Sequence, residues 1–448
     1  MRFSKQSGRN SSQNLVASLL ATCLLALTLI AGCGLNRVDS DVDVDLQFLV
    51  APAALSNLEV DVPWGFKLTL LGPKSTPTYI VIYGPSGLTV DNLGRITWTP
   101  TLGDLGTASV RIEARDGRQM AKVNFSLRVH QGILMGTAYS PLGHDVGVVT
   151  QDALDFLTAT THGRLVGYHT NWRDDGDTNA EIPMLVQSAM AARDQFGIEP
   201  TLVLGWADGQ GVPDLTSDSQ PNNNTWTNAE TRQEFLDMLT AVAATYRPKR
   251  LAIANEFNIW WATHPSEYAD WISLYQDAYD AIKLASSNTK VYLTFQLEFL
   301  KGEGQGWAHG VTWPAFDQMV LDGPMDIAAF TSYPYLEYAT PAAIPASHYD
   351  DISAHWDRGP VAFSEIGWLA APSFPYPGGQ ADQVAFLDRF FSLTTNINMK
   401  LVQWLFLHDV DGQAMFPPFV GIGLRSNDGT ILRPIDQAWQ EAVSLREL

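Results

Sequence analysis

Two glutamates stand out because each follows a short apolar run. Glu256 ends Leu-Ala-Ile-Ala-Asn-Glu, and Glu365 lies in Val-Ala-Phe-Ser-Glu-Ile-Gly-Trp. Such runs are typical of buried parallel strands, whose carboxyl ends meet at one mouth in a barrel. Two carboxyl groups there could cleave a glycosidic bond, since one can donate a proton to the leaving oxygen while the other acts on the anomeric carbon or on a nearby water. The pair favours an enzyme.

Other side chains near the predicted strand ends could bind a sugar. Asn255 could hydrogen-bond a hydroxyl beside the reacting carbon, and Tyr333 could orient Glu365. Polar candidates for contacts with hydroxyl groups, each of which could equally be structural, are Asp208, Gln296, Glu298 and His408. His169 and Arg173, after the second predicted strand, are further candidates for the site. Flat aromatic rings stack on the apolar faces of sugars, although any single tryptophan could instead be part of the hydrophobic core. The tryptophans placed at this end are Trp172, Trp206, Trp260, Trp261, Trp368 and Trp404.

Strand and helix patterns alternate after residue 130. Eight apolar runs begin near Ile133, Leu165, Thr201, Leu251, Val291, Asp326, Val361 and Leu401. Three- and four-residue periodicity predicts helices at Glu181 to Phe196, Thr227 to Tyr246, Pro265 to Ala285 and Gln380 to Leu393. Together they predict an α/β fold, a (βα)8 TIM barrel over 131–448. The main competitor is a doubly wound open sheet, but the glycine-rich phosphate turn that usually follows its first strand is missing.

Residues 46–130 have a different pattern. Short β-rich runs separated by turn residues predict a small β-sandwich. Two segments resemble bacterial immunoglobulin-like and cadherin-like modules: Gly-Leu-Thr-Val-Asp-Asn-Leu-Gly-Arg-Ile-Thr-Trp-Thr-Pro at 87–100 and Ala-Arg-Asp-Gly at 114–117. The resemblance implies a spacer or an adhesion unit. Residues 33–45 form the predicted linker, whose alternating aspartates either are solvated or bind calcium.

The N-terminus has the layout of an export signal. Arg2, Lys5 and Arg9 precede an apolar run that ends in Leu-Ile-Ala-Gly-Cys, with Cys33 last. This resembles a bacterial lipoprotein signal, which implies removal of residues 1–32 and acylation of Cys33. A membrane-spanning anchor is the alternative. Gly34 follows the cysteine, so the resemblance implies a lipid-anchored cell-envelope protein, in the outer membrane or at the cell surface if the organism is diderm.

Charge and missing motifs exclude several functions. The net charge of −20 argues against nucleic acid as a partner, because phosphate binding needs clustered Lys and Arg. The sequence contains neither the Gly-x-Ser-x-Gly turn that would indicate a serine nucleophile nor the His-Glu-x-x-His pair that would indicate a zinc site. Cys23, the only other cysteine, lies in the segment to be removed, so no disulfide is expected. We expect neither a metal nor another cofactor.

Four motifs carry a more specific resemblance. Asn-Glu at 255–256, Ser-Tyr-Pro-Tyr at 332–335, Ser-Glu-Ile-Gly-Trp at 364–368 and Val-Gln-Trp at 402–404 resemble those of clan A glycoside hydrolases. The resemblance implies that Glu256 is the acid/base, Glu365 the nucleophile, Asn255 a hydroxyl ligand, Tyr333 the partner of Glu365 and Trp404 a sugar platform. It implies a retaining reaction on a β-linked polysaccharide or oligosaccharide. A noncatalytic carbohydrate-binding protein and a structural adhesin remain alternatives.

Overall fold

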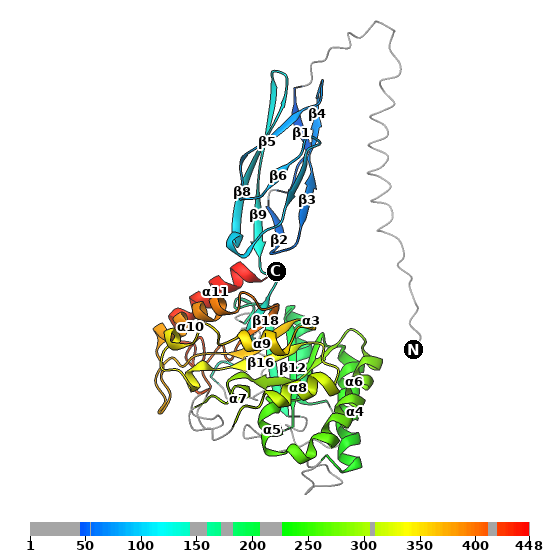
Figure 1. The fold of residues 1–448 in the computed structure, drawn as a ribbon, viewed down its shortest axis with the longest axis vertical. Coiled ribbons are helices and arrows are strands. Elements are labelled where there is room, and N and C mark those ends of the chain that lie inside the picture. The colour runs from blue at the N-terminus through cyan, green and yellow to red at the C-terminus, as the bar shows by residue number, and fades with distance from the viewer. Residues whose placement is uncertain are drawn as a thin grey trace, which may run out of the picture.

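The computed structural model describes residues 45–53, 55–143, 159–171, 182–206, 226–304, 310–410 and 419–447. It contains a small β domain and a larger α/β domain, stacked along the long axis of the molecule (Figure 1). The predicted signal and the predicted lipidation site Cys33 lie outside the described residues. So do the linker aspartates other than Asp45, and the candidate site residues Trp172, Arg173 and Asp208. No helix in the described ranges is long and apolar enough to cross a membrane.

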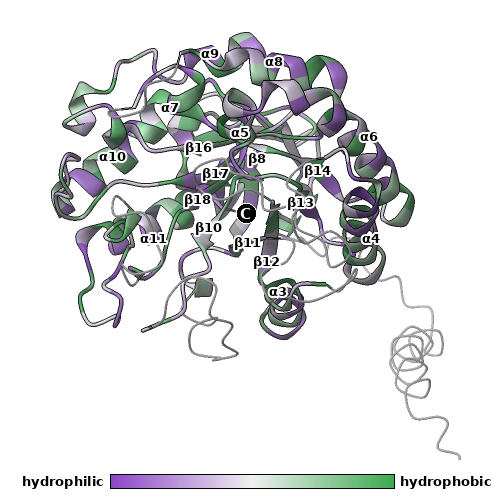
Figure 2. Cartoon of the chain, turned by 90° about the horizontal axis from the view of Figure 1, so that it is seen from below, coloured by the Kyte–Doolittle hydropathy of each residue, from purple (hydrophilic) through white to green (hydrophobic). Residues whose placement is uncertain are grey.

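The larger domain is built around one parallel sheet, which Figure 2 shows end-on. Its strands are β10 (Leu134–Ala138), β11 (Leu165–Asn171), β12 (Glu199–Gly205), β13 (Arg250–Ala252), β14 (Lys290–Tyr292), β15 (Thr294–Gln296), β16 (Ala328–Ser332), β17 (Val361–Ile366) and β18 (Met399–Trp404). The sheet order runs from β14 through β10 and β18 to β15. Only Leu293 separates β14 from β15, so the predicted fifth strand joins both ends of the sheet. The predicted barrel of eight strand positions is confirmed.

Helices cover the outside of the sheet (Figure 2). They include α3 (Met184–Phe196), α4 (Ala229–Tyr246), α6 (Tyr268–Ala285), α8 (Trp313–Asp322), α9 (Asp350–His355), α10 (Gln380–Leu393) and α11 (Pro434–Arg446). The sequence explains α4 well. Asn228 caps it by accepting a hydrogen bond from the Thr231 N–H at 3.0 Å, and one face buries Phe235, Leu239 and Val242. The four predicted helices are confirmed, with starts shifted by up to three residues.

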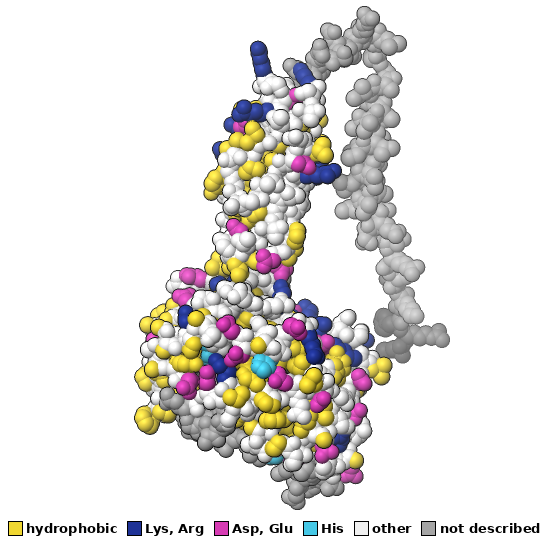
Figure 3. Space-filling view, in the orientation of Figure 1, with side chains coloured by type: hydrophobic (Ala, Val, Ile, Leu, Met, Phe, Trp, Pro, Cys, Tyr) yellow, Lys and Arg dark blue, Asp and Glu magenta, His cyan; other side chains and the backbone are white. Residues whose placement is uncertain are grey.

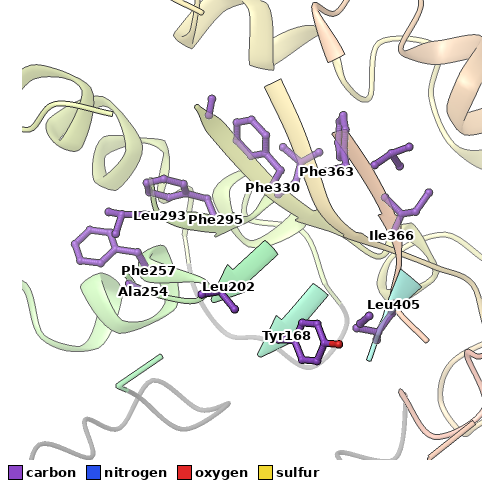
Figure 4. Packing of buried hydrophobic residues seen from close by; sticks show 14 of the residues in the cluster. Tyr168, Leu202, Ala254, Phe257, Leu293, Phe295, Phe330, Phe363, Ile366 and Leu405 are labelled. Carbon is purple, nitrogen blue, oxygen red and sulfur yellow. The ribbon is translucent and has the colours of Figure 1, made fainter. Parts of the chain in front are cut away.

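Two apolar layers hold the barrel together. The larger layer lies between strands and helices, and Figure 4 shows part of it, including Phe295 and Phe330 on neighbouring strands. A smaller cluster takes one or two residues from each strand position, including Leu165, Val203 and Leu401. Space within the barrel is limited, because a Cβ on Gly167 would lie 2.0 Å from Oε1 of Gln403. Gln403 of β18 therefore points across the barrel interior toward β11, which is two strands away in the sheet.

The small domain contains three sheets. One has the order β2 (Leu55–Glu59), β9 (Gln119–His130), β8 (Gly106–Asp116), β5 (Thr78–Tyr83). A second has the order β3 (Trp64–Lys67), β7 (Arg95–Trp98), β6 (Thr89–Val90), and β1 (Gln47–Val50) pairs with β4 (Thr69–Leu71). The two larger sheets share one apolar cluster, as expected of a small sandwich. The resemblance to immunoglobulin-like modules stays a prediction.

The β domain contacts the amino-terminal end of the barrel. Lys400, at the start of β18, pairs with Glu59 at 2.8 Å, and Arg128 Nη2 donates to the Ser444 carbonyl at 2.8 Å. The junction turns at Gly132, whose φ of 71° is left-handed. In Figure 1, α5 (Phe257–Thr263), which follows strand β13, lies at the opposite end. The carboxyl ends of the strands therefore face away from the β domain.

Candidate active site

Glu256 lies just beyond β13, where the backbone takes an unusual conformation. Its φ of 45° and ψ of 48° are left-handed, which disfavours most residues with a Cβ. The turn is fixed by Thr294 on the next strand position: the Glu256 N–H donates to Thr294 Oγ1 at 2.8 Å, and that hydroxyl donates to Asn255 Oδ1 at 2.7 Å. Backbone strain of this kind concentrates at functional sites. Here it places the Glu256 side chain where Thr331 Oγ1 donates to its Oε1 at 2.6 Å.

Glu365 lies within β17 and is held by two other strand positions. The Tyr333 hydroxyl, just after β16, donates to Glu365 Oε2, and His169 Nδ1 on β11 lies 3.0 Å from Oε1. The Glu365 side chain is only 9% exposed. The other ring nitrogen of His169, Nε2, is buried without a hydrogen-bond partner, so it has capacity for a ligand hydroxyl.

The two glutamates interact electrostatically. Burial, together with the negative charge of Glu365, raises the pKa of Glu256 to about 8, although the hydrogen bond from Thr331 opposes this rise. Glu256 is therefore mostly protonated at neutral pH. Burial and the charge of Glu365 also raise the pKa of Tyr333 well above its usual value, so the phenol remains a donor. A neutral carboxylic acid beside a carboxylate held by two donors is suited to proton donation paired with nucleophilic attack.

The structure contradicts the prediction that Trp404 is a sugar platform. Its ring is fully buried, and it contacts Phe386 of α10 and Trp439 of α11, while Nε1 donates to the Ile422 carbonyl at 2.8 Å. These partners lie on the helix side of β18. Successive residues of a strand point to opposite faces, and Gln403 occupies the inward position, so Trp404 points outward.

The sugar-stacking prediction is also wrong for Trp206, Trp260 and Trp368. Trp206 and Trp260 pack edge to face at 4.9 Å within an aromatic cluster that includes Trp271 of α6, and both are at most 2% exposed. Trp368 is fully buried between Phe386 and Tyr335. An aromatic residue at a strand end serves the core equally well, and here the core contacts decide. Trp261, the remaining described tryptophan that was expected to stack on sugar, is partly buried and packs against the same core.

Two polar candidates are likewise structural. Gln296 is 1% exposed, and its amide donates to Glu298 Oε2 at 2.6 Å while accepting from the Phe299 N–H, so the prediction that it binds substrate is wrong. His408 is buried, with Nδ1 3.0 Å from the Ser140 carbonyl. Asn255 is half-buried beside Glu256 and stays a candidate ligand.

The site thus gathers Glu256, Glu365, Tyr333, His169 and Asn255 from four strand positions. The sequence analysis did not identify Thr294, which holds the backbone of Glu256, or Thr331, which holds its carboxyl group. Only their places in strands five and six could have suggested them, and threonine is common in any strand. Across the described parts of the chain, no three His, Cys, Asp or Glu side chains gather in a way that could hold a metal ion.

No protein-family model and no curated protein matches this sequence. Solved structures do. GH5_18 from Streptomyces cattleya, in complex with GlcNAc, aligns with a TM-score of 0.53 at 18% identity over 70% of this chain and 80% of its own. The exo-β-1,4-mannosidase Op5Man5 from Opitutaceae bacterium strain TAV5 aligns with a TM-score of 0.52 at 15% identity over 70% of this chain and 60% of its own. What they share with this chain is the fold.

Proposed function

We propose that this protein is a retaining glycoside hydrolase that acts on a β-linked polysaccharide or oligosaccharide. The observation that carries the proposal is the pairing of Glu256, kept protonated by burial and by Glu365, with Glu365 itself, which Tyr333 and His169 hold from two sides. The similarly folded GH5_18 in complex with GlcNAc and exo-β-1,4-mannosidase Op5Man5 support sugar as the ligand class.

Each residue has a role in the proposed reaction. Glu365 attacks the anomeric carbon while Glu256 gives its proton to the leaving glycosidic oxygen, which forms a glycosyl-enzyme ester and frees the leaving sugar. Glu256, now ionised, then takes a proton from water, which attacks the same carbon and releases Glu365. In this proposal Asn255 and His169 Nε2 bind hydroxyl groups of the sugar, which is supported by the position of Asn255 beside Glu256 and by the absence of a partner on His169 Nε2 among the described residues. Retention itself rests on the resemblance to clan A.

The test is reducing-sugar release from β-glucans, galactans, mannans and xylans by the soluble 40–448 segment, beside Glu256→Gln and Glu365→Gln. We expect activity on one substrate class and its loss in both variants. Proton NMR of the first product would give its anomeric configuration, which retention requires to match the substrate. Full activity of Glu365→Gln would overturn the assigned nucleophile. Binding without hydrolysis on every polymer would favour the noncatalytic carbohydrate-binding alternative.

We also propose that the chain is anchored to the cell envelope through acylated Cys33, with residues 46–130 acting as a spacer. The layout of the first 33 residues supports the anchor, and the β domain lies at the barrel end opposite the site, as a spacer would require. Figure 3 shows Asp and Glu scattered over the visible face of the barrel, with Lys and Arg among them. Metabolic labelling with a palmitate analogue, lost in Cys33→Ala, tests the anchor.

A further inference from the structure

Glu298 is a fully buried carboxylate outside the pair just described. It lies in the short helix α7 (Leu297–Leu300), directly after β15, and is 0% exposed. Four donors surround it. Oε2 accepts from Gln296 Nε2 at 2.6 Å and from the Tyr333 N–H at 2.9 Å, while Oε1 accepts from Ser332 Oγ at 2.8 Å and lies 3.3 Å from His348 Nε2. An ionised carboxylate only accepts, and about four lone-pair positions are available, so its capacity is filled.

We propose that Glu298 is a positioning residue that sets the Tyr333 hydroxyl on Glu365; this inference rests on the proposed function. Glu298 contacts Ser332, the last residue of β16, through its hydroxyl, and Tyr333, directly after the strand, through its backbone N–H. The Tyr333 ring is then confined by Tyr335 and Phe419 at centroid distances of 6.0 and 4.9 Å. Because the backbone and the ring of Tyr333 are both held, its hydroxyl group is directed toward Glu365.

His348 connects Glu298 to a positive charge. Lys301 Nζ lies 3.0 Å from His348 Nδ1. Since a lysine ammonium can only donate, Nδ1 must accept, which leaves the imidazole proton on Nε2, facing Glu298. Lys301 also donates to the His348 carbonyl at 3.0 Å and pairs with Glu303 at 3.2 Å. A histidine between a carboxylate and an ammonium gives the buried charge of Glu298 a hydrogen-bonded partner without making it accessible to solvent.

The hydrogen bonds keep Glu298 ionised. Burial opposes ionisation, but donation by His348, the Tyr333 N–H and Ser332 outweighs it and holds the pKa of Glu298 below its usual value. The phenols around it are those of Tyr333, Tyr335, Tyr338 and Tyr349, all with pKa values raised above normal, largely by burial.

The charge on Glu298 also reaches the proposed acid. Behind the larger effects of burial and Glu365, it contributes to the raised pKa of Glu256. Glu256 is therefore faced by two carboxylates and by the Tyr333 phenol. Glu298 consequently affects both members of the catalytic pair: Glu365 through the position of Tyr333, and Glu256 through the field in the site.

Glu298→Gln tests both effects with little change in size. A glutamine amide turns its NH2 group toward at least one of the donors, which displaces the end of β16. We expect kcat to fall by roughly 100-fold, as for a misplacement of about 1 Å at a reacting centre, with little change in KM. The alkaline limb of the kcat/KM profile moves to lower pH, because Glu256 loses one negative neighbour. Glu337→Gln is the matched control: its carboxylate accepts from the Gly304 N–H, so activity and profile should stay unchanged.

Two further measurements do not need turnover. Titration of a 13C-labelled Glu256 carboxyl should give a lower pKa in Glu298→Gln, and a crystal structure should show a lengthened contact between the Tyr333 hydroxyl and Glu365. If the wild type cleaves no sugar, the proposed function fails while these readouts still decide the positioning role. If Glu298→Gln does not fold, Glu298→Asp replaces it: the charge remains, so kcat should fall with the alkaline limb unmoved. An unchanged kcat in a folded Glu298 variant, or an unchanged Tyr333–Glu365 contact, would overturn the inference.

Discussion

The phenol of Tyr333 donates to Oε2 of Glu365 while His169 occupies the other oxygen, Oε1, of the same carboxylate. Residues from the sixth and second strand positions thus fix the carboxylate of the seventh, which is the proposed nucleophile. The carboxylate has one orientation in which both contacts are made. In the proposed reaction, this arrangement prepares Glu365 for attack before substrate binds, and each contact can be removed separately.

Tyr333→Phe removes one donor from Glu365 and leaves the buried ring in place. A hydrogen bond to a charged group contributes about 1.5–3 kcal/mol, so we expect kcat to fall by roughly 10- to 150-fold on the substrate found in the screen. The melting temperature should change by less than it does for a substitution that leaves a cavity. Steady-state kinetics beside calorimetry separates the two effects. Wild-type kcat in this variant would contradict the role of Tyr333.

The alkaline limb of the pH profile should lie near pH 8, because Glu256 must be protonated to donate to the leaving group. Thr331→Val deletes the hydrogen bond that lowers the pKa of Glu256, so this limb should move to higher pH. Thr240→Val, which removes a hydroxyl bonded only to the Leu236 carbonyl on a helix of the barrel exterior, is a suitable control. A limb that moves downward in Thr331→Val would contradict the proposed donation.

Folding stability should reflect the same carboxyl. The pKa of Glu256 is raised in the native state, so its favourable contribution is present below about pH 4.5 and is lost as pH rises through about 8. Glu256→Gln has no such dependence. Compared with wild type, it should become progressively more stable between these pH values, which urea unfolding at pH 4.5, 6.5 and 8.5 would measure. A stability difference that does not change with pH would contradict the half-buried, protonated state of Glu256.

Trp404→Ala should act on stability, because the ring fills the layer between β18 and helices α10 and α11. Truncation of a buried tryptophan destabilises by about 3–5 kcal/mol. In the milder Trp404→Phe we expect KM to stay near the wild-type value, since the ring does not face the site. Phe374→Ala, at a side chain that is 99% exposed, is the control for stability. A large rise in KM for Trp404→Phe, with stability retained, would restore the sugar-platform interpretation.

Sequence patterns alone were sufficient to predict the barrel, its strand positions and the placement of Glu256 and Glu365 at one mouth. Apolar runs and helical periodicity are local, and parallel strands bring their carboxyl ends together whatever the details of packing. Tyr333 as the partner of Glu365 came from a resemblance, and the structure brings these two residues together. The interruption of the fifth strand at Leu293 was not predictable, because every residue from Val291 to Phe295 is of a type that is common in strands.

Tertiary structure decided which side chains at the mouth belong to the site. A strand has two faces, and its sequence does not say which one a tryptophan takes; contacts with Phe386 and Trp439 turned Trp404 outward. The raised pKa of Glu256 depends on burial and on Glu365, more than 100 positions away, and the partners of Glu298 come from three segments of the chain. The protonation state of a buried carboxyl group is set by its neighbours in space. Local sequence was therefore sufficient to identify the carboxylates, whereas packing determined their protonation and their hydrogen-bond partners.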